Sequence, residues 1–152
     1  MRRPSSQLIG AAYYMAGHVV LAFHFGLVIK NIEVLENGDA GAELPAAEHL
    51  PQLDRVTVCM GGTAAQTHFQ APATDDLMMA DYAAILGFTP KMSNDEREAI
   101  IERGFARARS VVAKNAEEVA RIAKVLMVWR SVDLSDVQPR VGATEIPISP
   151  RR

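Results

Sequence analysis

Two side chains near the start of the chain, Tyr14 and His18, stand one helical turn apart and can face the same partner. Zinc-dependent hydrolysis from a single helix requires two histidines at this spacing. It also requires a glutamate directly after the first histidine, to take a proton from the metal-bound water. His18 is the second histidine, but Tyr14 and Met15 occupy the other two positions. The segment therefore has the spacing of a zinc site without its chemistry.

The two substituted positions decide what this segment can do. The thioether of Met15 cannot accept a proton from water. A tyrosine with an ordinary pKa of about 10 is a poor zinc ligand at neutral pH. We therefore predict no catalytic residue at the degenerate positions Tyr14, Met15 and His18.

The overall composition indicates one soluble globular domain. The chain has 152 residues, of which 49% are hydrophobic and 22% are charged. Its net charge of −2, without a stripe of basic and aromatic residues, argues against a nucleic-acid partner. Cys59 is the only cysteine, so an internal disulfide is impossible, which fits a cytoplasmic location.

The stretch from Leu8 to Ile29 contains no formally charged residue and is long enough to span a bilayer. His18 and His24 would lie within that span, where polar groups are costly. Gly17 interrupts it as well. We therefore predict a helix buried in a protein core, and we keep a small helical membrane-associated protein, anchored through residues 8–29, as an alternative.

The first half of the chain predicts one helix followed by a hairpin. Ser5 or Ser6 can cap a helix that runs to about Phe25, with Gly26 as its terminator. Residues 28–36 alternate between apolar and polar and favour a strand. The turn at Asn37-Gly38-Asp39 favours a second short strand over residues 40–44.

The second half predicts helices only. Gly61-Gly62 begins a helix of small residues that can pack closely on a neighbour. Thr74 or Asp75 can cap a further helix that runs to about Leu86 and ends at Gly87.

The sequence Ser93-x-x-Glu96 is a capping box and opens a helical region that extends to about Arg130. This region is one long helix or two helices joined near Lys114-Asn115. The predicted architecture is mainly α with a small antiparallel β element, as a single domain over residues 1–137. Residues 138–152 are predicted to form an extended or disordered tail.

Several segments together carry a family resemblance. Residues 11–20 (AAYYMAGHVV), 59–66 (CMGGTAAQ) and 73–80 (ATDDLMMA) occur in the order expected of the FtsH-type zinc peptidase domain of membrane-bound AAA+ proteases, which the chain resembles over roughly residues 8–137. The resemblance implies a helical peptidase-like fold. No Gly-x-x-x-x-Gly-Lys-Ser/Thr motif is present, so the ATPase module of that family is not expected.

The resemblance also places Asp76 at the position of the third zinc ligand in the family. The vestigial metal positions it implies are therefore His18 and Asp76. Other interpretations remain open for both residues. Asp76 can cap the start of its helix, and His18 can be a core histidine hydrogen-bonded to Tyr14 or Asp76.

The favoured interpretation is a non-catalytic, peptidase-like domain that binds or scaffolds a protein or peptide, with a homo-oligomer as a possible assembly. No cofactor is expected. The alternative is an active zinc metallopeptidase that uses substitute ligands, namely His18, Asp76 and either His24 or His68. Metal content distinguishes these two interpretations.

Overall fold

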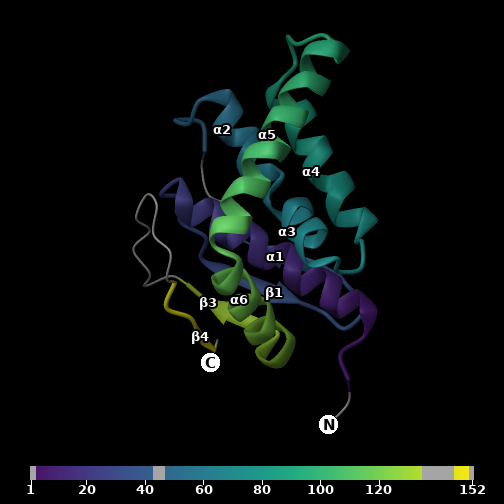
Figure 1. Ribbon diagram of the computed structural model, residues 1–152, viewed down its shortest axis with the longest axis vertical. Coiled ribbons are helices and arrows are strands. Elements are labelled where there is room, and N and C mark those ends of the chain that lie inside the picture. Colours follow the sequence, from purple (N-terminus) through teal and green to yellow (C-terminus); the bar gives the residue numbers. More distant parts are fainter. Residues whose placement is uncertain (1–2, 43–46, 135–145, 151–152) are drawn as a thin grey trace.

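The structure is a computed structural model, and it describes residues 3–42, 47–134 and 146–150 (Figure 1). The helices are α1 (Ser6–His24), α2 (Gln52–Cys59), α3 (Gly61–Phe69), α4 (Asp75–Phe88), α5 (Asn94–Lys114) and α6 (Ala116–Trp129). The strands are β1 (Asn31–Val34), β2 (Ala40–Ala42), β3 (Ser131–Asp133) and β4 (Ser149–Pro150). The predicted class, mainly α with a small antiparallel sheet, is confirmed.

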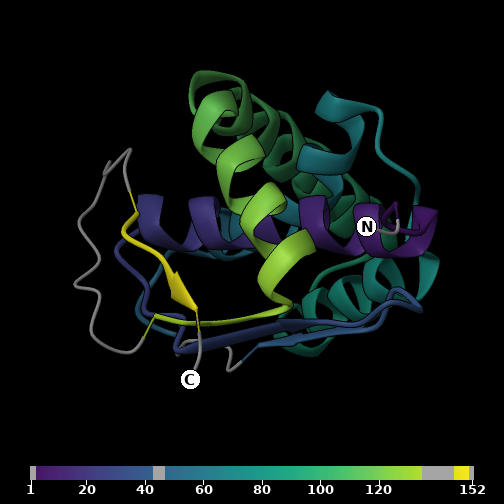
Figure 2. The same cartoon turned by 90° about the horizontal axis from the view of Figure 1, so that it is seen from below.

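Helix α1 is the centre of the core. The Ser5 side chain caps it by accepting a hydrogen bond from the Leu8 amide, and Gly26 follows its end with a φ of 74°. Its middle is buried almost all round, as expected for a helix that is apolar on every face. Helices α3 and α6 pack against it, and Figure 2 shows it lying above the sheet. The predicted first helix is confirmed.

Glycine permits the close approach of α1 and α3. A Cβ placed on Gly17 would lie 2.2 Å from the Gly61 carbonyl oxygen and 2.6 Å from the Ala65 Cβ. A Cβ on Gly62 would meet the ring of Tyr14 at 2.7 Å. The prediction that the Gly61-Gly62 helix packs closely on a neighbour is therefore confirmed, and this contact fixes the position of the Tyr14 ring.

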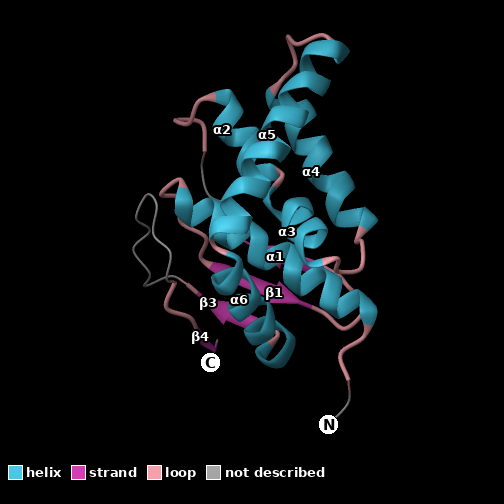
Figure 3. Cartoon of the chain, viewed as in Figure 1, coloured by secondary structure: helices cyan, strands magenta, loops and turns pink. Residues whose placement is uncertain are grey.

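The described strands form one antiparallel sheet in the order β2-β1-β3-β4 (Figure 3). Ile32 pairs with Ala42 on one side and with Val132 on the other. The β1–β2 turn lies at the predicted Asn37-Gly38-Asp39, where Gly38 adopts a φ of 93°. The strand predicted over residues 28–36 is shorter than expected, and strands β3 and β4 were not predicted.

The remaining helices follow their local signals with one exception. The Ser93–Glu96 capping box is formed, and Asn115 separates α5 from α6, so the alternative with two helices is the correct one. The prediction that Gly87 ends α4 is wrong, because the helix continues through it to Phe88. Glycine in the last turn weakens a helix without forcing it to stop.

The boundary proposed between domain and tail, at residues 137 and 138, lies outside the described residues. The described end of the tail is extended: β4 pairs with β3, and the Ile146 side chain is buried in the core. Within the described parts of the chain, no helix combines the length and apolarity needed to cross a membrane.

Candidate functional site

A cavity of about 230 Å³ lies between α1, α4, the β1–β2 hairpin and the end of α2. Tyr14, His18 and Asp81 are its only titratable lining residues among those described. The other lining residues are apolar or small, and they are Met15, Ala22, Ile29, Ala40, Gly41, Ala42, Val58, Leu77 and Ala80. The site is thus a mostly apolar cavity with one polar wall.

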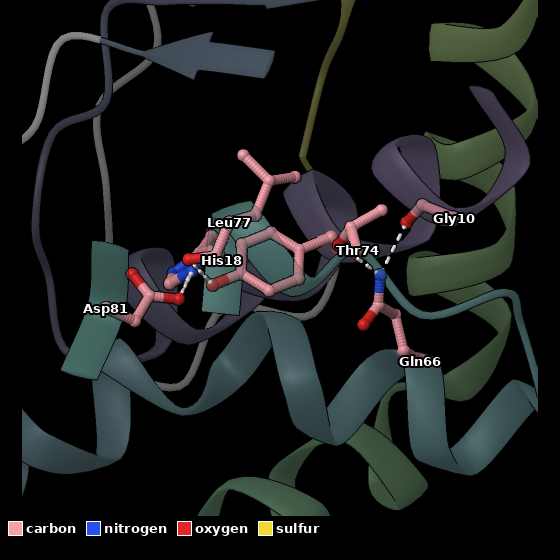
Figure 4. Close-up of polar contacts among 7 residues, drawn as sticks. Gly10, His18, Gln66, Thr74, Leu77 and Asp81 are labelled. Atoms are coloured by element: carbon pink, nitrogen blue, oxygen red, sulfur yellow. Dashed lines mark hydrogen bonds and ion pairs between the residues drawn. The ribbon is translucent and has the colours of Figure 1, made fainter. Parts of the chain in front are cut away.

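The polar wall is built around a histidine–aspartate pair. His18 Nε2 lies 3.0 Å from Asp81 Oδ2, and Figure 4 shows the two side chains pointing toward each other. The other side of the ring is hydrogen-bonded to the backbone carbonyl of Val58. These side chains are only 12% and 21% exposed, so water solvates the pair poorly. His18 is therefore held on both sides by protein groups.

Burial controls the protonation of this pair. Desolvation lowers the pKa of His18 to about 4, against a smaller opposing effect from the Val58 hydrogen bond. Desolvation raises the pKa of Asp81 to about 8. A contact of 3.0 Å fits either an ion pair or a neutral hydrogen bond, and both shifts favour the neutral form. In that neutral form the carboxyl of Asp81 donates to Nε2, and the ring donates to the Val58 carbonyl.

A second contact joins the same two helices one turn earlier. The Tyr14 hydroxyl donates a hydrogen bond of 2.9 Å to the Leu77 carbonyl oxygen. Both contacts join residues separated by 63 positions, so α1 and α4 run side by side in parallel at this point. Tyr14 also meets the His18 ring edge-on, with a centroid distance of 4.9 Å. Tyr14 thus packs against the His18 ring and forms the part of the polar wall next to it.

The start of α4 is fastened by a buried glutamine. Gln66 donates to the Gly10 carbonyl oxygen at 3.0 Å and to the Thr74 hydroxyl at 2.7 Å (Figure 4). Gly10 also allows the Pro72 carbonyl to approach α1, since a Cβ there would lie 2.3 Å from that oxygen. The chain therefore enters α4 at a fixed point beside α1, and this sets which α4 residues reach the cavity.

The structure brings together some of the sequence-predicted residues and not others. Tyr14, Met15 and His18 all line the cavity, whereas Asp76 is exposed in the first turn of α4 and is not among the lining residues. The carboxylate beside His18 is that of Asp81, which the sequence analysis missed. One signal could have identified it: Asp81 is the only charged residue between Leu77 and Phe88.

The histidines considered as substitute ligands lie elsewhere. His24 stands in the last turn of α1 with its ring against Phe25, and His68 is an exposed residue of α3. Neither lines the cavity. The described part of the chain contains no group of three or more His, Cys, Asp or Glu side chains placed to hold a metal ion. The donors among these described residues therefore do not supply the three protein ligands of a catalytic zinc centre.

A comparison of the chain with protein-family models gave no match, and a comparison with curated proteins gave none either.

Proposed function

We propose that this protein is a non-catalytic binding domain whose cavity receives one apolar side chain of a protein or peptide partner. The observation that carries the proposal is the composition of the cavity, in which Met15 and other apolar side chains form most of the wall. Sites of this kind gain affinity from apolar burial and orientation from a few polar groups. Methionine also adapts its shape to varied partners.

The polar groups of the cavity support binding rather than hydrolysis. The Tyr14 hydroxyl and both sides of the His18 ring are engaged by protein partners. A general base must be within hydrogen-bond reach of the proton that it takes and must be free to take it. The neutral His18–Asp81 pair instead gives the cavity one weakly polar side. It carries no net charge that an apolar side chain would have to desolvate on binding.

Binding of apolar probes to the cavity tests this proposal directly. We expect N-acetyl leucinamide or N-acetyl phenylalaninamide, at millimolar concentration, to shift the methyl resonance of Met15 and the ring resonances of His18 in NMR spectra. The substitution Ala42→Phe should fill the cavity and remove these shifts, because Ala42 lines it. A matched Ala113→Phe change, at an exposed position of α5, should leave them unchanged.

Three outcomes of the probe experiment would contradict the proposal. These are an absence of shifts in the wild type, equal shifts with N-acetyl aspartate amide, and persistence of the shifts in a folded Ala42→Phe variant. The circular dichroism spectrum of each variant shows whether it has kept its fold.

Metal analysis tests the non-catalytic part of the proposal. We expect the purified wild type to hold less than stoichiometric zinc and to leave casein uncleaved. The double change Tyr14→His, Met15→Glu should raise zinc to about one ion per chain, because two imidazoles one turn apart would then stand beside a carboxylate. In that background Asp81→Asn should lose the ion, whereas Asp76→Asn should keep it, because Asp81 and not Asp76 contacts His18.

Stoichiometric zinc in the wild type, with casein cleavage that a chelator blocks, would overturn the proposed function. Failure of the double variant to gain zinc would instead contradict the idea that the cavity is a former zinc site. The binding proposal would then depend on the apolar probe experiment alone. Loss of zinc with Asp76→Asn alone would show that Asp76 is the third ligand.

A further inference from the structure

The described end of the chain, residues 146–150, lies against α6 and β3, and it is called the tail segment below. Its last part, β4, is the outer strand of the sheet, where Pro150 lies opposite Val132 (Figure 1). Its first residue, Ile146, is only 1% exposed, and Ile148 packs against the core as a partly buried side chain. The tail segment is therefore held by apolar side chains as well as by strand pairing.

Two charged side chains of α6 bind the main chain of Ile146. The Ile146 N–H donates to Glu118 Oε1 at 3.1 Å, and Arg121 donates to the Ile146 carbonyl oxygen. Arg121 also donates to both carboxylate oxygens of Glu118, so each of the two side chains holds the other in place. The pair thus binds the donor and the acceptor of one residue together. Main-chain contacts of this kind, beside a place for one apolar side chain, are how peptide-binding sites recognise an extended segment.

The sequence of the tail segment favours an extended backbone before any contact is made. Ile146 and Ser149 each precede a proline, which disfavours the helical conformation for both. Pro147 and Pro150 have their own φ angles fixed by the ring. A segment already extended loses less conformational entropy when it docks. The tail segment therefore has the properties of a preorganised peptide ligand.

The contact between the tail segment and α6 lies at the surface. An open groove of about 600 Å³ runs along it and is lined by Glu117, Glu118, Arg121, Ile146 and Pro147. The Arg121 side chain is 45% exposed, and Pro147 is exposed. Only the two isoleucines of the tail segment pack inward. The segment is therefore attached to the outside of the fold rather than enclosed by it.

We infer that Glu118, Arg121 and strand β3 form a second peptide-binding site, and that the tail segment is its tethered ligand. The site fits an extended segment in which proline follows an isoleucine, and a partner that presents an Ile-Pro-Ile sequence competes with the tail segment for it. Because the tail segment belongs to the same chain, its effective concentration at the site is high. The site therefore accepts such a partner only when the tail segment has detached.

A free peptide with the sequence of residues 144–152 tests the inference on the full chain. The peptide carries a fluorescent label, and its anisotropy reports binding. The variant Ile146→Asp should release the tail segment, because it places a carboxylate in an apolar position beside Glu118. This variant should bind the peptide at least roughly 10-fold more tightly than the wild type, in which the tethered segment competes. The same peptide with aspartate in place of both isoleucines should not bind.

A change at the charged pair tests the main-chain contact. In the Ile146→Asp background, Glu118→Ala should weaken peptide binding by roughly 10-fold, because it removes the acceptor for the isoleucine N–H and frees Arg121. The matched control is Glu117→Ala. Both glutamates lie in the first turn of α6, but Glu117 is exposed and only Glu118 bonds to the tail segment. The control should therefore bind the peptide with unchanged affinity.

The wild type gives a measurement that does not depend on a variant. Several millimolar peptide should displace the tail segment, and the Ile146 methyl resonance should move toward the shift of an exposed isoleucine. A resonance that stays in place would overturn the inference. So would a folded Ile146→Asp variant that does not bind the peptide, equal affinities of that variant and the wild type, or equal effects of Glu118→Ala and Glu117→Ala. An unfolded Ile146→Asp variant, seen by circular dichroism, would overturn it too, because release of the tail segment must leave the rest of the fold intact.

Discussion

Replacing Gly17 with alanine should destabilise the protein more than any other single-methyl addition in the α1–α3 contact. The added carbon would lie 2.2 Å from the Gly61 carbonyl oxygen and 2.6 Å from the Ala65 Cβ, so the two helices must move apart. Neither obstacle is the end of a flexible side chain that could turn away. We expect the free energy of unfolding to fall by roughly 3 kcal/mol, measured by urea denaturation at one low protein concentration.

Gly87→Ala is the matched control, because Gly87 is also helical and a Cβ built there meets nothing within 4 Å. That change should raise the free energy of unfolding by up to about 1 kcal/mol, since alanine is the better helix former. A Gly17→Ala variant as stable as the wild type would show that α1 and α3 are farther apart than the structure places them.

The stability of the protein should fall as the pH rises from about 6.5 to 8. Burial raises the pKa of Asp81 to about 8, so the folded protein keeps a proton there that the unfolded chain has already released. The state that binds more protons loses stability as pH rises, and we expect a loss of roughly 1–2 kcal/mol across this interval. Chemical denaturation at a series of pH values measures it.

The pH dependence of stability that the His18–Asp81 pair causes should nearly vanish below pH 6.5. Between pH 6.5 and about 4 the unfolded chain holds a proton on His18 that the folded protein does not bind, because burial lowers the pKa of that histidine. This difference offsets the extra proton on Asp81 in the folded state. The two contributions have opposite signs, so the pair contributes almost no slope in this range.

Asp81→Asn separates these contributions. The amide can still donate to His18 Nε2, but it does not titrate. The variant should therefore lose the slope between pH 6.5 and 8 that the wild type shows. It should gain a slope below pH 6.5, with stability falling as the pH decreases, because the buried His18 is then no longer offset. Equal pH profiles for the variant and the wild type would contradict the raised pKa of Asp81 in the folded protein.

The helices could be predicted from the sequence because their signals are local. Ser5, Gly26 and the Ser93–Glu96 box act within one or two turns of their own position. Strands β3 and β4 could not be predicted in the same way. Both strands are short. They form because β3 pairs with β1, which lies far away in the sequence, and β4 pairs with β3. Nothing in residues 131–133 alone distinguishes them from a loop.

The candidate site could be predicted in part for the same reason. The helical spacing of Tyr14 and His18 was enough to place both on one face, and both line the cavity. The choice between Asp76 and Asp81 depends on how α4 is rotated and shifted relative to α1. That offset is set by Gln66 and the close approach at Gly10, which are tertiary contacts. The identity of the acidic partner therefore needed the structure.

Helix α4 buries far fewer side chains than α1, and this difference affects how the two helices move. Only Ile85 of α4 is fully buried, and hydrogen bonds from Tyr14, His18 and Gln66 hold the helix and its start beside α1, whereas α1 is enclosed on almost every side. Backbone amides of α4 should consequently exchange with deuterium through sub-global opening, while those of α1 should exchange only when the whole molecule unfolds. That exchange pattern would mean that the α4 side of the cavity opens without global unfolding, while the α1 side stays in place.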